Sequence, residues 1–251
     1  MSGHSKWSSI KHKKGAADAK RGKLFSKLTR AIIVAAKEGG GDPAGNLALQ
    51  NAIEKAKSYS MPKDNIDRAI AKGAGTDADA ADYESIVYEG YGPAGVAVIV
   101  EALTDNRNRT AGEVRHTFAK NDGNLGTSGA VAWLFERRGV VLVPADGTDE
   151  DELTLAAAEG GADDVALDGT TFEVLCAGEQ LAAVRTAIEA AGFAIDSAEL
   201  TMVPKTTVEV EEENDAKKLL RLIEALEDND DVQEVYANFD IPEAVLEAVA
   251  G

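Results

Sequence analysis

The hydrophobic repeat of this 251-residue chain changes across residues 73–82, and the change separates two kinds of structure. Before it, Leu24, Leu28 and Ile32 recur at steps of four, which predicts a helix. Asp42-Pro43 is expected to open a second helix as N-cap and first helical residue, with its apolar stripe over 49–56. A third helix is predicted over 62–73. Residues 73–82 are small, acidic and without a period. We therefore predict a basic arm plus helical domain over 1–75, followed by a linker over 76–82.

Beyond residue 83 the pattern becomes one of alternating strands and helices. Apolar runs over 83–89 and 96–103 predict two strands joined by a glycine-rich turn. A helix over 106–120 and a strand over 130–135 follow. Residues 138–204 then read strand, helix, strand, strand, helix, strand, with Asp168-Gly169 as a hairpin turn. That order is typical of a ferredoxin-like βαββαβ unit.

The last segment, 205–251, predicts two more strands and two helices. We predict that its strands pair with those of 83–137, on the opposite side of the ferredoxin-like unit in sequence. The unit 138–204 would then be inserted in a discontinuous α/β middle domain of 83–137 and 205–251. The predicted fold class is therefore α+β, with an N-terminal helical bundle followed by two α/β domains.

Charge is divided unevenly along the chain. There are 26 Lys and Arg against 44 Asp and Glu, a net charge of −18. Residues 1–75, however, hold fifteen basic residues against six acidic ones. Salt screens charges beyond ~8 Å, so a basic segment responds to its local field rather than to the chain average. A basic block on an acidic protein is typical of an arm that binds a polyanion.

The candidate nucleic-acid contacts in this block are its cations and the rings between them. Cations contact phosphates, and aromatic rings stack on bases. The candidates are Lys6, Trp7, Lys11, His12, Lys13, Lys14, Lys20, Arg21, Lys23, Lys27 and Arg30. Several of them repeat at steps of three and four, so one helix offers an apolar face to a core and a basic face to a partner. The alternative is a solvated lysine-rich tail.

A second polar group, over 105–116, lies at a strand end and a helix start. Arg107 and Arg109 add two cations to the positive end of a helix dipole, which is locally unfavourable. Binding a phosphate through their planar guanidinium groups would offset this unfavourable interaction with the dipole. The alternative is an ion-pair network with nearby carboxylates, and catalysis by Glu113 and His116 is a third interpretation.

Which nucleic acid the chain binds stays open at this stage. The bundle permits a helix-turn-helix interpretation with the 62–73 helix in the major groove. Asp64 and Asp67 on that helix would meet a phosphate-lined groove, which is unfavourable. The arm and the first helix carry the stronger charge but no bidentate base-reading set. These features fit structured or single-stranded RNA at least as well as DNA.

Other classes of site are excluded or disfavoured. The three histidines lack metal-ligand spacing, and the single cysteine, Cys176, excludes an internal disulfide and is expected in the core. Residues 123–129 are glycine-rich and could cradle a phosphate, but their spacing matches no known phosphate loop, and we prefer an irregular connection between helix and strand. We predict no catalytic residue, metal, cofactor or small-molecule substrate. The chain has no apolar run of ~18 residues, so we expect a cytoplasmic protein without a membrane partner.

Several motifs in order give the chain a specific resemblance to a known family. They are Gly3-His-Ser-Lys-Trp7, Ile10-Lys-His-Lys-Lys14, Asp18-Ala-Lys-Arg-Gly-Lys23, Met61-Pro-Lys-Asp-Asn-Ile66, Tyr88-Glu-Gly-Tyr-Gly-Pro93, Leu103-Thr-Asp-Asn-Arg-Asn-Arg-Thr110 and Gly123-Asn-Leu-Gly-Thr-Ser-Gly129. The sequence resembles the YebC/PmpR family, also represented by a mitochondrial translational activator of cytochrome oxidase subunit I. It departs from the pattern at Ala94 and Asp122, where the family is expected to have glycine.

The resemblance implies a helical N-terminal domain and two α/β domains, the third inserted in the second. It implies no enzyme activity. The family's customary description is DNA-binding transcriptional regulator. Its members are also linked to translation, as ribosome-associated factors that help synthesis through stretches such as consecutive prolines. In that case ribosomal RNA or tRNA would be the partner of the basic arm and of Arg107 and Arg109.

Overall fold

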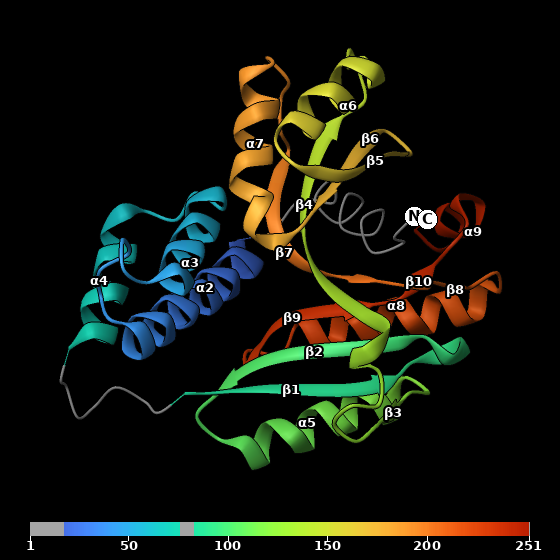
Figure 1. Ribbon diagram of the computed structural model, residues 1–251. Coiled ribbons are helices and arrows are strands. Elements are labelled where there is room, and N and C mark those ends of the chain that lie inside the picture. The colour runs from blue at the N-terminus through green and yellow to red at the C-terminus, as the bar shows by residue number, and fades with distance from the viewer. Residues whose placement is uncertain (1–17, 76–82, 251) are drawn as a thin grey trace.

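The computed structural model describes residues 18–75 and 83–250 (Figure 1). It consists of an N-terminal helical bundle and two sheets that carry helices. The helices are α2 Asp18–Gly39, α3 Leu47–Ser58, α4 Lys63–Ala74, α5 Arg107–Lys120, α6 Glu150–Glu159, α7 Leu181–Ala190, α8 Glu213–Glu227 and α9 Glu243–Ala250. The strands are β1 Glu84–Tyr91, β2 Ala97–Thr104, β3 Asn124–Leu125, β4 Phe135–Pro144, β5 Ala162–Asp168, β6 Thr171–Cys176, β7 Ser197–Pro204, β8 Val208–Glu209, β9 Val232–Ala237 and β10 Phe239–Asp240.

In the bundle, α2 packs against α3 and α4 through the predicted apolar stripe. Leu28 and Ile32 are buried, and they meet Leu49 of α3 and Ile66 of α4 in one cluster. The helix begins at Asp18, before the predicted start at Leu24, because the residues between are mostly good helix formers.

The start of α3 differs from the sequence prediction. We expected Asp42-Pro43 to open this helix, whereas the N-cap is Asn46, which accepts a hydrogen bond from the Leu49 N–H. The Asn46 amide also donates to the Ala35 and Gly40 carbonyls, at 2.7 and 2.8 Å. These bonds tie the end of α2 to the start of α3, which an Asp side chain without N–H groups could not do.

The first sheet is antiparallel with the order β3-β1-β2-β9. The predicted pairing across the inserted unit is therefore present, since β9 lies beside β2. Helices α5 and α8 cover one face of this sheet, where Val98 and Val100 meet Phe118, Leu219 and other buried side chains. This arrangement brings the turn after α8 close to the start of α5.

The second sheet has the order β5-β6-β4-β7, with all neighbours antiparallel. It carries α6 and α7 on one face, and its core contains Val141, Leu153 and Val184. The elements follow one another as βαββαβ, which confirms the ferredoxin-like unit. Cys176 is fully buried in this core and burial raises the pKa of its thiol, so it has the predicted packing role.

β4 links the two sheets and corrects one predicted element. We expected separate strands over 130–135 and 140–143, whereas β4 runs unbroken from Phe135 to Pro144 and pairs with β7 from Phe135 onward. Residues 131 and 132 precede the strand because their N–H groups donate to the Glu89 carboxylate and cannot join a ladder. Figure 1 shows β4 extending from the lower sheet to the upper one.

The two departures from the family pattern lie at left-handed backbone positions. Ala94 and Asp122 both have φ of 57°. Residues other than glycine rarely adopt this conformation, because Cβ approaches the following carbonyl. The expectation of glycine at both positions therefore has a backbone cause.

Candidate nucleic-acid interface

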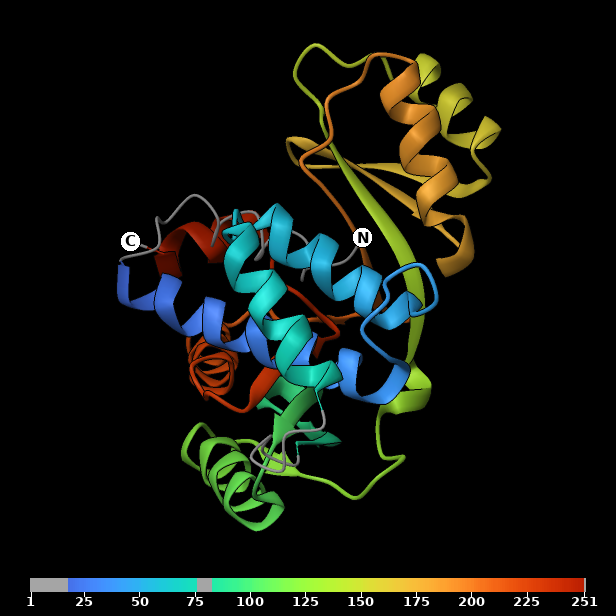
Figure 2. The ribbon, with the colours of Figure 1, turned by 90° about the vertical axis from the view of Figure 1, so that its left-hand side faces the viewer.

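The cations predicted on the first helix form a row beside its buried stripe. Lys23, Lys27 and Arg30 lie at steps of four and three along α2, so they point from one side of the helix. Lys27 and Arg30 on that side are only partly exposed, while Lys23 is exposed. The same side faces residues 227–231, at the end of α8 and in the turn before β9, and Figure 2 shows α8 nearly end-on beneath α2.

Backbone carbonyls at the end of α8 accept hydrogen bonds from this row. Lys23 Nζ donates to the Asp228 carbonyl at 3.2 Å, and Lys27 Nζ donates to the Glu227 carbonyl. Arg30 Nη1 donates to the Asp230 carbonyl at 2.7 Å. The last carbonyls of a helix lack partners within it and carry the negative end of its dipole, so cations are stabilised there.

Asp231 is the centre of this contact. Its carboxylate is 5% exposed and accepts a hydrogen bond from Arg30 at 3.1 Å on one oxygen. The other oxygen accepts from Arg109 at 2.7 Å, Thr110 at 2.7 Å and Thr104 at 3.0 Å. Burial alone would raise the pKa of Asp231, but these hydrogen bonds outweigh it and hold the pKa below its ordinary value. Asp231 therefore stays ionised and joins α2 to α5.

A second polar contact joins α3 to β9. Lys55 pairs with Glu234, close to Glu101, Tyr59 and Tyr236. Burial would lower the pKa of Lys55, but the charge and hydrogen bond of Glu234 leave it above its ordinary value. Burial also raises the pKa of Glu101, of Tyr59 and of Tyr236. The bundle thus rests on the middle sheet through ion pairs and hydrogen bonds.

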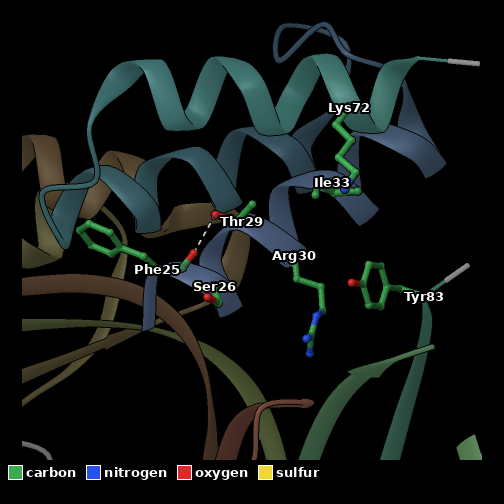
Figure 3. Close-up of a pocket in the computed structure, with 7 residues that line it drawn as sticks. All are labelled: Phe25, Ser26, Thr29, Arg30, Ile33, Lys72 and Tyr83. Atoms are coloured by element: carbon green, nitrogen blue, oxygen red, sulfur yellow. Dashed lines mark hydrogen bonds between the residues drawn. The ribbon is translucent and has the colours of Figure 1, made fainter. Parts of the chain in front are cut away.

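A shallow hollow of about 320 Å³ opens beside this contact (Figure 3). Arg30 stands at its base, and its guanidinium carbon lies 4.9 Å from the ring centre of Tyr83. The hydroxyl groups of Thr29 and Ser26 donate hydrogen bonds to backbone carbonyls of α2. Lys72 is exposed at the rim.

The two arginines of α5 have different surroundings. Arg109 lies between Asp105, at 2.9 Å, and Asp231, and the hydrogen bonds that its guanidinium group donates to these carboxylates raise its pKa. Arg107, at the first position of the helix, is exposed. Arg109 thus lies in the ion-pair network that was the alternative to a phosphate contact, while Arg107 is exposed. Glu113 accepts a hydrogen bond from Asn229 at 2.8 Å.

The glycine-rich segment 123–129 leads into a loop whose N–H groups bind an anionic side chain of the same chain, that of Glu89. The Glu89 carboxylate accepts N–H groups from Gly129, Val131 and Ala132 at 2.7–2.8 Å. Burial would raise the pKa of Glu89, and these three hydrogen bonds bring it below its ordinary value. The loop is thereby fixed on β1, so its N–H groups are used within the chain.

Part of the predicted site lies outside the described residues, namely Lys6, Trp7, Lys11, His12, Lys13 and Lys14. Lys20 and Arg21 are in the first turn of α2, but their side chains also lie outside the description. Within 18–75 and 83–250, no group of His, Cys, Asp and Glu is arranged to hold a metal ion. None of the helices in these ranges is long and apolar enough to cross a membrane.

The structure brings together two predicted cations that lie far apart in sequence, Arg30 and Arg109, on a carboxylate that the sequence analysis did not single out. Asp231 sits in the run Asp228-Asn-Asp-Asp231, which reads as a solvated acidic turn. The available signal was the charge itself, since an acidic turn after an apolar helix is a suitable partner for a basic stripe. Sequence alone did not identify which acidic segment that would be.

Comparisons with known proteins agree with this architecture. Residues 5–76 match the model of the TACO1/YebC protein N-terminal domain, and residues 83–239 match that of the TACO1/YebC second and third domain. The chain belongs to the TACO1/YebC family.

Two TACO1/YebC relatives are similar to the chain over its full length. One from Rubrobacter xylanophilus is 61% identical over all of both chains, and one from Desulfotalea psychrophila is 58% identical over all of both. Each is named a probable transcriptional regulatory protein. The crystal structure of a conserved hypothetical protein from Aquifex aeolicus is 50% identical, with a TM-score of 0.79 over 90% of this chain and 93% of that one.

Proposed function

We propose that this chain is a non-enzymatic regulator of gene expression that binds nucleic acid through its basic N-terminal region. The observation that carries the proposal is the charge division, fifteen basic residues against six acidic ones over 1–75 in a chain of net charge −18. The names of the relatives support a regulator. A duplex DNA target, and hence control of transcription in the cytoplasm, is the first candidate.

Binding would rest on the cations of the arm, with Trp7 and His12 stacking on exposed bases. Arg107 would add a contact from α5, because it is exposed at the start of that helix. The remainder of the chain, which is strongly acidic, would repel a polyanion and confine it to the basic side.

The second candidate is ribosomal RNA or tRNA, with a role in translation. It is favoured by the exposed surface of α4, the helix that would enter the major groove of an operator. Asp64 and Asp67 are exposed there beside Lys63 and Arg68. The two aspartates offset most of the positive charge of the helix, so it presents little net positive charge to a phosphate-lined groove.

The salt dependence of binding tests the proposal. We would replace Lys11, Lys13 and Lys14 with Ala and measure fluorescence anisotropy with a duplex DNA and with a single-stranded RNA. Each lost phosphate contact lowers the slope of log K against log salt by about 0.7–0.9, so the triple variant should lose about 2–3 units. Its control removes three lysines from the acidic part, Lys120, Lys205 and Lys217, and should keep the slope. An unchanged slope in the first variant would refute the arm as the binding element.

Fractionation of cell lysate separates the two candidates. Protein that migrates with ribosomes at moderate salt, and loses this migration in the triple lysine variant, supports the translation role. Protein that stays in the free fraction and is captured with promoter DNA supports the transcription role.

A further inference from the structure

Three of the α2 cations that were predicted to contact nucleic acid are bound by another part of the same chain. Lys23, Lys27 and Arg30 donate to carbonyls of residues 227–230, and Arg30 also pairs with Asp231. The Arg30 side chain is only 17% exposed. A phosphate cannot approach its guanidinium group unless α2 moves away from the end of α8.

The donor groups in this contact are the ones to which a phosphate would bind. Ammonium and guanidinium N–H groups bind a carbonyl, a carboxylate or a phosphate oxygen in the same way, and charged acceptors bind more strongly. Residues 227–231 present such oxygens to the row from the backbone and from Asp228 and Asp231. Glu234, at the end of the same segment, binds Lys55 of α3 and so holds the bundle against it. The segment 227–234 therefore offers the basic row of α2 an acidic partner within the chain.

We propose that residues 227–234 act as an intramolecular competitor of nucleic acid for the cation row of α2. In the closed state, which the structure shows, the row is bound to this segment. In the open state the bundle leaves the segment, and the row is free for phosphates. This inference rests on the proposed function and adds a conformational step to it.

The contact combines one buried ion pair, Arg30–Asp231, with more exposed pairs that salt weakens. A bound phosphate would have to replace Asp231 as the partner of Arg30. Lys23 and Asp228 are 50% and 68% exposed and 3.9 Å apart, and Lys55 and Glu234 are each 36% exposed. Exposed pairs of this kind shift an equilibrium by up to about fivefold each and weaken with salt. Since apparent affinity falls in proportion to the fraction of open protein, the segment sets how tightly the chain binds nucleic acid.

Carbodiimide cross-linking of the full chain measures the closed state directly, because it joins a Lys amine to a carboxylate that touches it. We would quantify the Lys55–Glu234 and Lys23–Asp228 cross-links by mass spectrometry. The Lys218–Asp122 pair, 2.7 Å apart and within the middle region, is the internal control. The probe is whichever of the duplex DNA and the single-stranded RNA binds more tightly, without terminal phosphates.

At saturating probe, the two cross-links between bundle and sheet should fall several-fold while the Lys218–Asp122 cross-link is unchanged. If the probe is bound and the Lys55–Glu234 yield stays the same, the inference is overturned and the α2 cations are structural. If anisotropy detects no binding at all, the proposed function fails instead, so the two failures are distinguishable.

A pair of variants tests the same inference without cross-linking. Glu234→Gln removes the partner of Lys55, whereas Glu224→Gln makes the same charge change at an exposed position on α8. The first should bind the probe about two- to fivefold more tightly than the second, because it favours the open state. Equal affinities, with both variants folded by circular dichroism, would contradict the competition.

Discussion

Replacing Asp231 with Asn should destabilise the folded chain strongly, because the carboxylate serves four side-chain donors in a buried place. Asn has the same shape, but it lacks the charge and turns an NH₂ group toward these donors. Removing one partner from a buried ion pair costs about 3–5 kcal/mol. Arg109 is 44% exposed and keeps a second carboxylate, and Arg30 keeps its carbonyl bonds, so we expect about 3 kcal/mol.

Thermal unfolding followed by circular dichroism measures this effect. For a chain of this size, 1 kcal/mol shifts Tm by about 2–4 °C, so Asp231→Asn should lower it by about 6–12 °C. The control is Asp230→Asn, one residue away, where the side chain is exposed and the backbone carbonyl makes the contact. The control should change Tm by less than about 2 °C. Equal shifts for the two variants would refute the central role of the carboxylate.

The same residue gives a pH dependence with a definite sign. The pKa of Asp231 is lower in the folded chain than in the unfolded one. Its contribution to the free energy of unfolding is therefore complete above an unfolded pKa of about 4 and is lost as pH falls below it, toward the folded value. The stability difference between the natural chain and Asp231→Asn should shrink below about pH 4. A stability difference that is constant from pH 7 to pH 3 would show that the pKa of Asp231 is not lowered by folding.

Two other substitutions test local features of the middle region. Ala94→Gly should stabilise the chain by about 1 kcal/mol, because Ala94 is exposed and has a left-handed φ of 57°. Its control, Ala71→Gly, makes the same chemical change on the exposed side of α4. There the substitution should destabilise the chain by a similar amount, because glycine disfavours a helix. Midpoints of urea unfolding measure both, and a shift of the same sign in the two variants would contradict the argument. Glu89→Gln should cost about 2 kcal/mol since one of its acceptors is replaced by a donor facing N–H groups, whereas Glu136→Gln at an exposed position of β4 should have little effect. Equal urea midpoints for these two variants would exclude Glu89 as the anchor of its loop.

The fold was largely predictable because each element carries its own local pattern. The stripe of Leu24, Leu28 and Ile32 specified α2, and the strand and helix order of 138–204 specified the ferredoxin-like unit. The errors fell where a long-range contact overrides the local signal. The apolar run over 130–135 has the composition of a strand, but its N–H groups are used by Glu89, some forty residues earlier in the chain.

The candidate site was less predictable, for a related reason. A cation row on one helix face is suited to an acidic partner, but its sequence neither requires such a partner nor identifies it. Charges attract without sequence specificity, so phosphates and the turn at 227–231 satisfy the same row. That α2 lies against the end of α8 follows from tertiary packing, which the spacing of Lys23, Lys27 and Arg30 does not encode.

Ultraviolet cross-linking of the chain to nucleic acid in living cells would show directly whether the basic N-terminal region binds nucleic acid. Mass spectrometry would locate the adducts on the protein, and sequencing would identify the attached nucleic acid. Adducts concentrated within residues 1–30, together with DNA or RNA recovered above background, are the predicted result. Adducts confined to the acidic part beyond residue 83, or no adducts at all, would contradict the proposal that the basic N-terminal region binds nucleic acid.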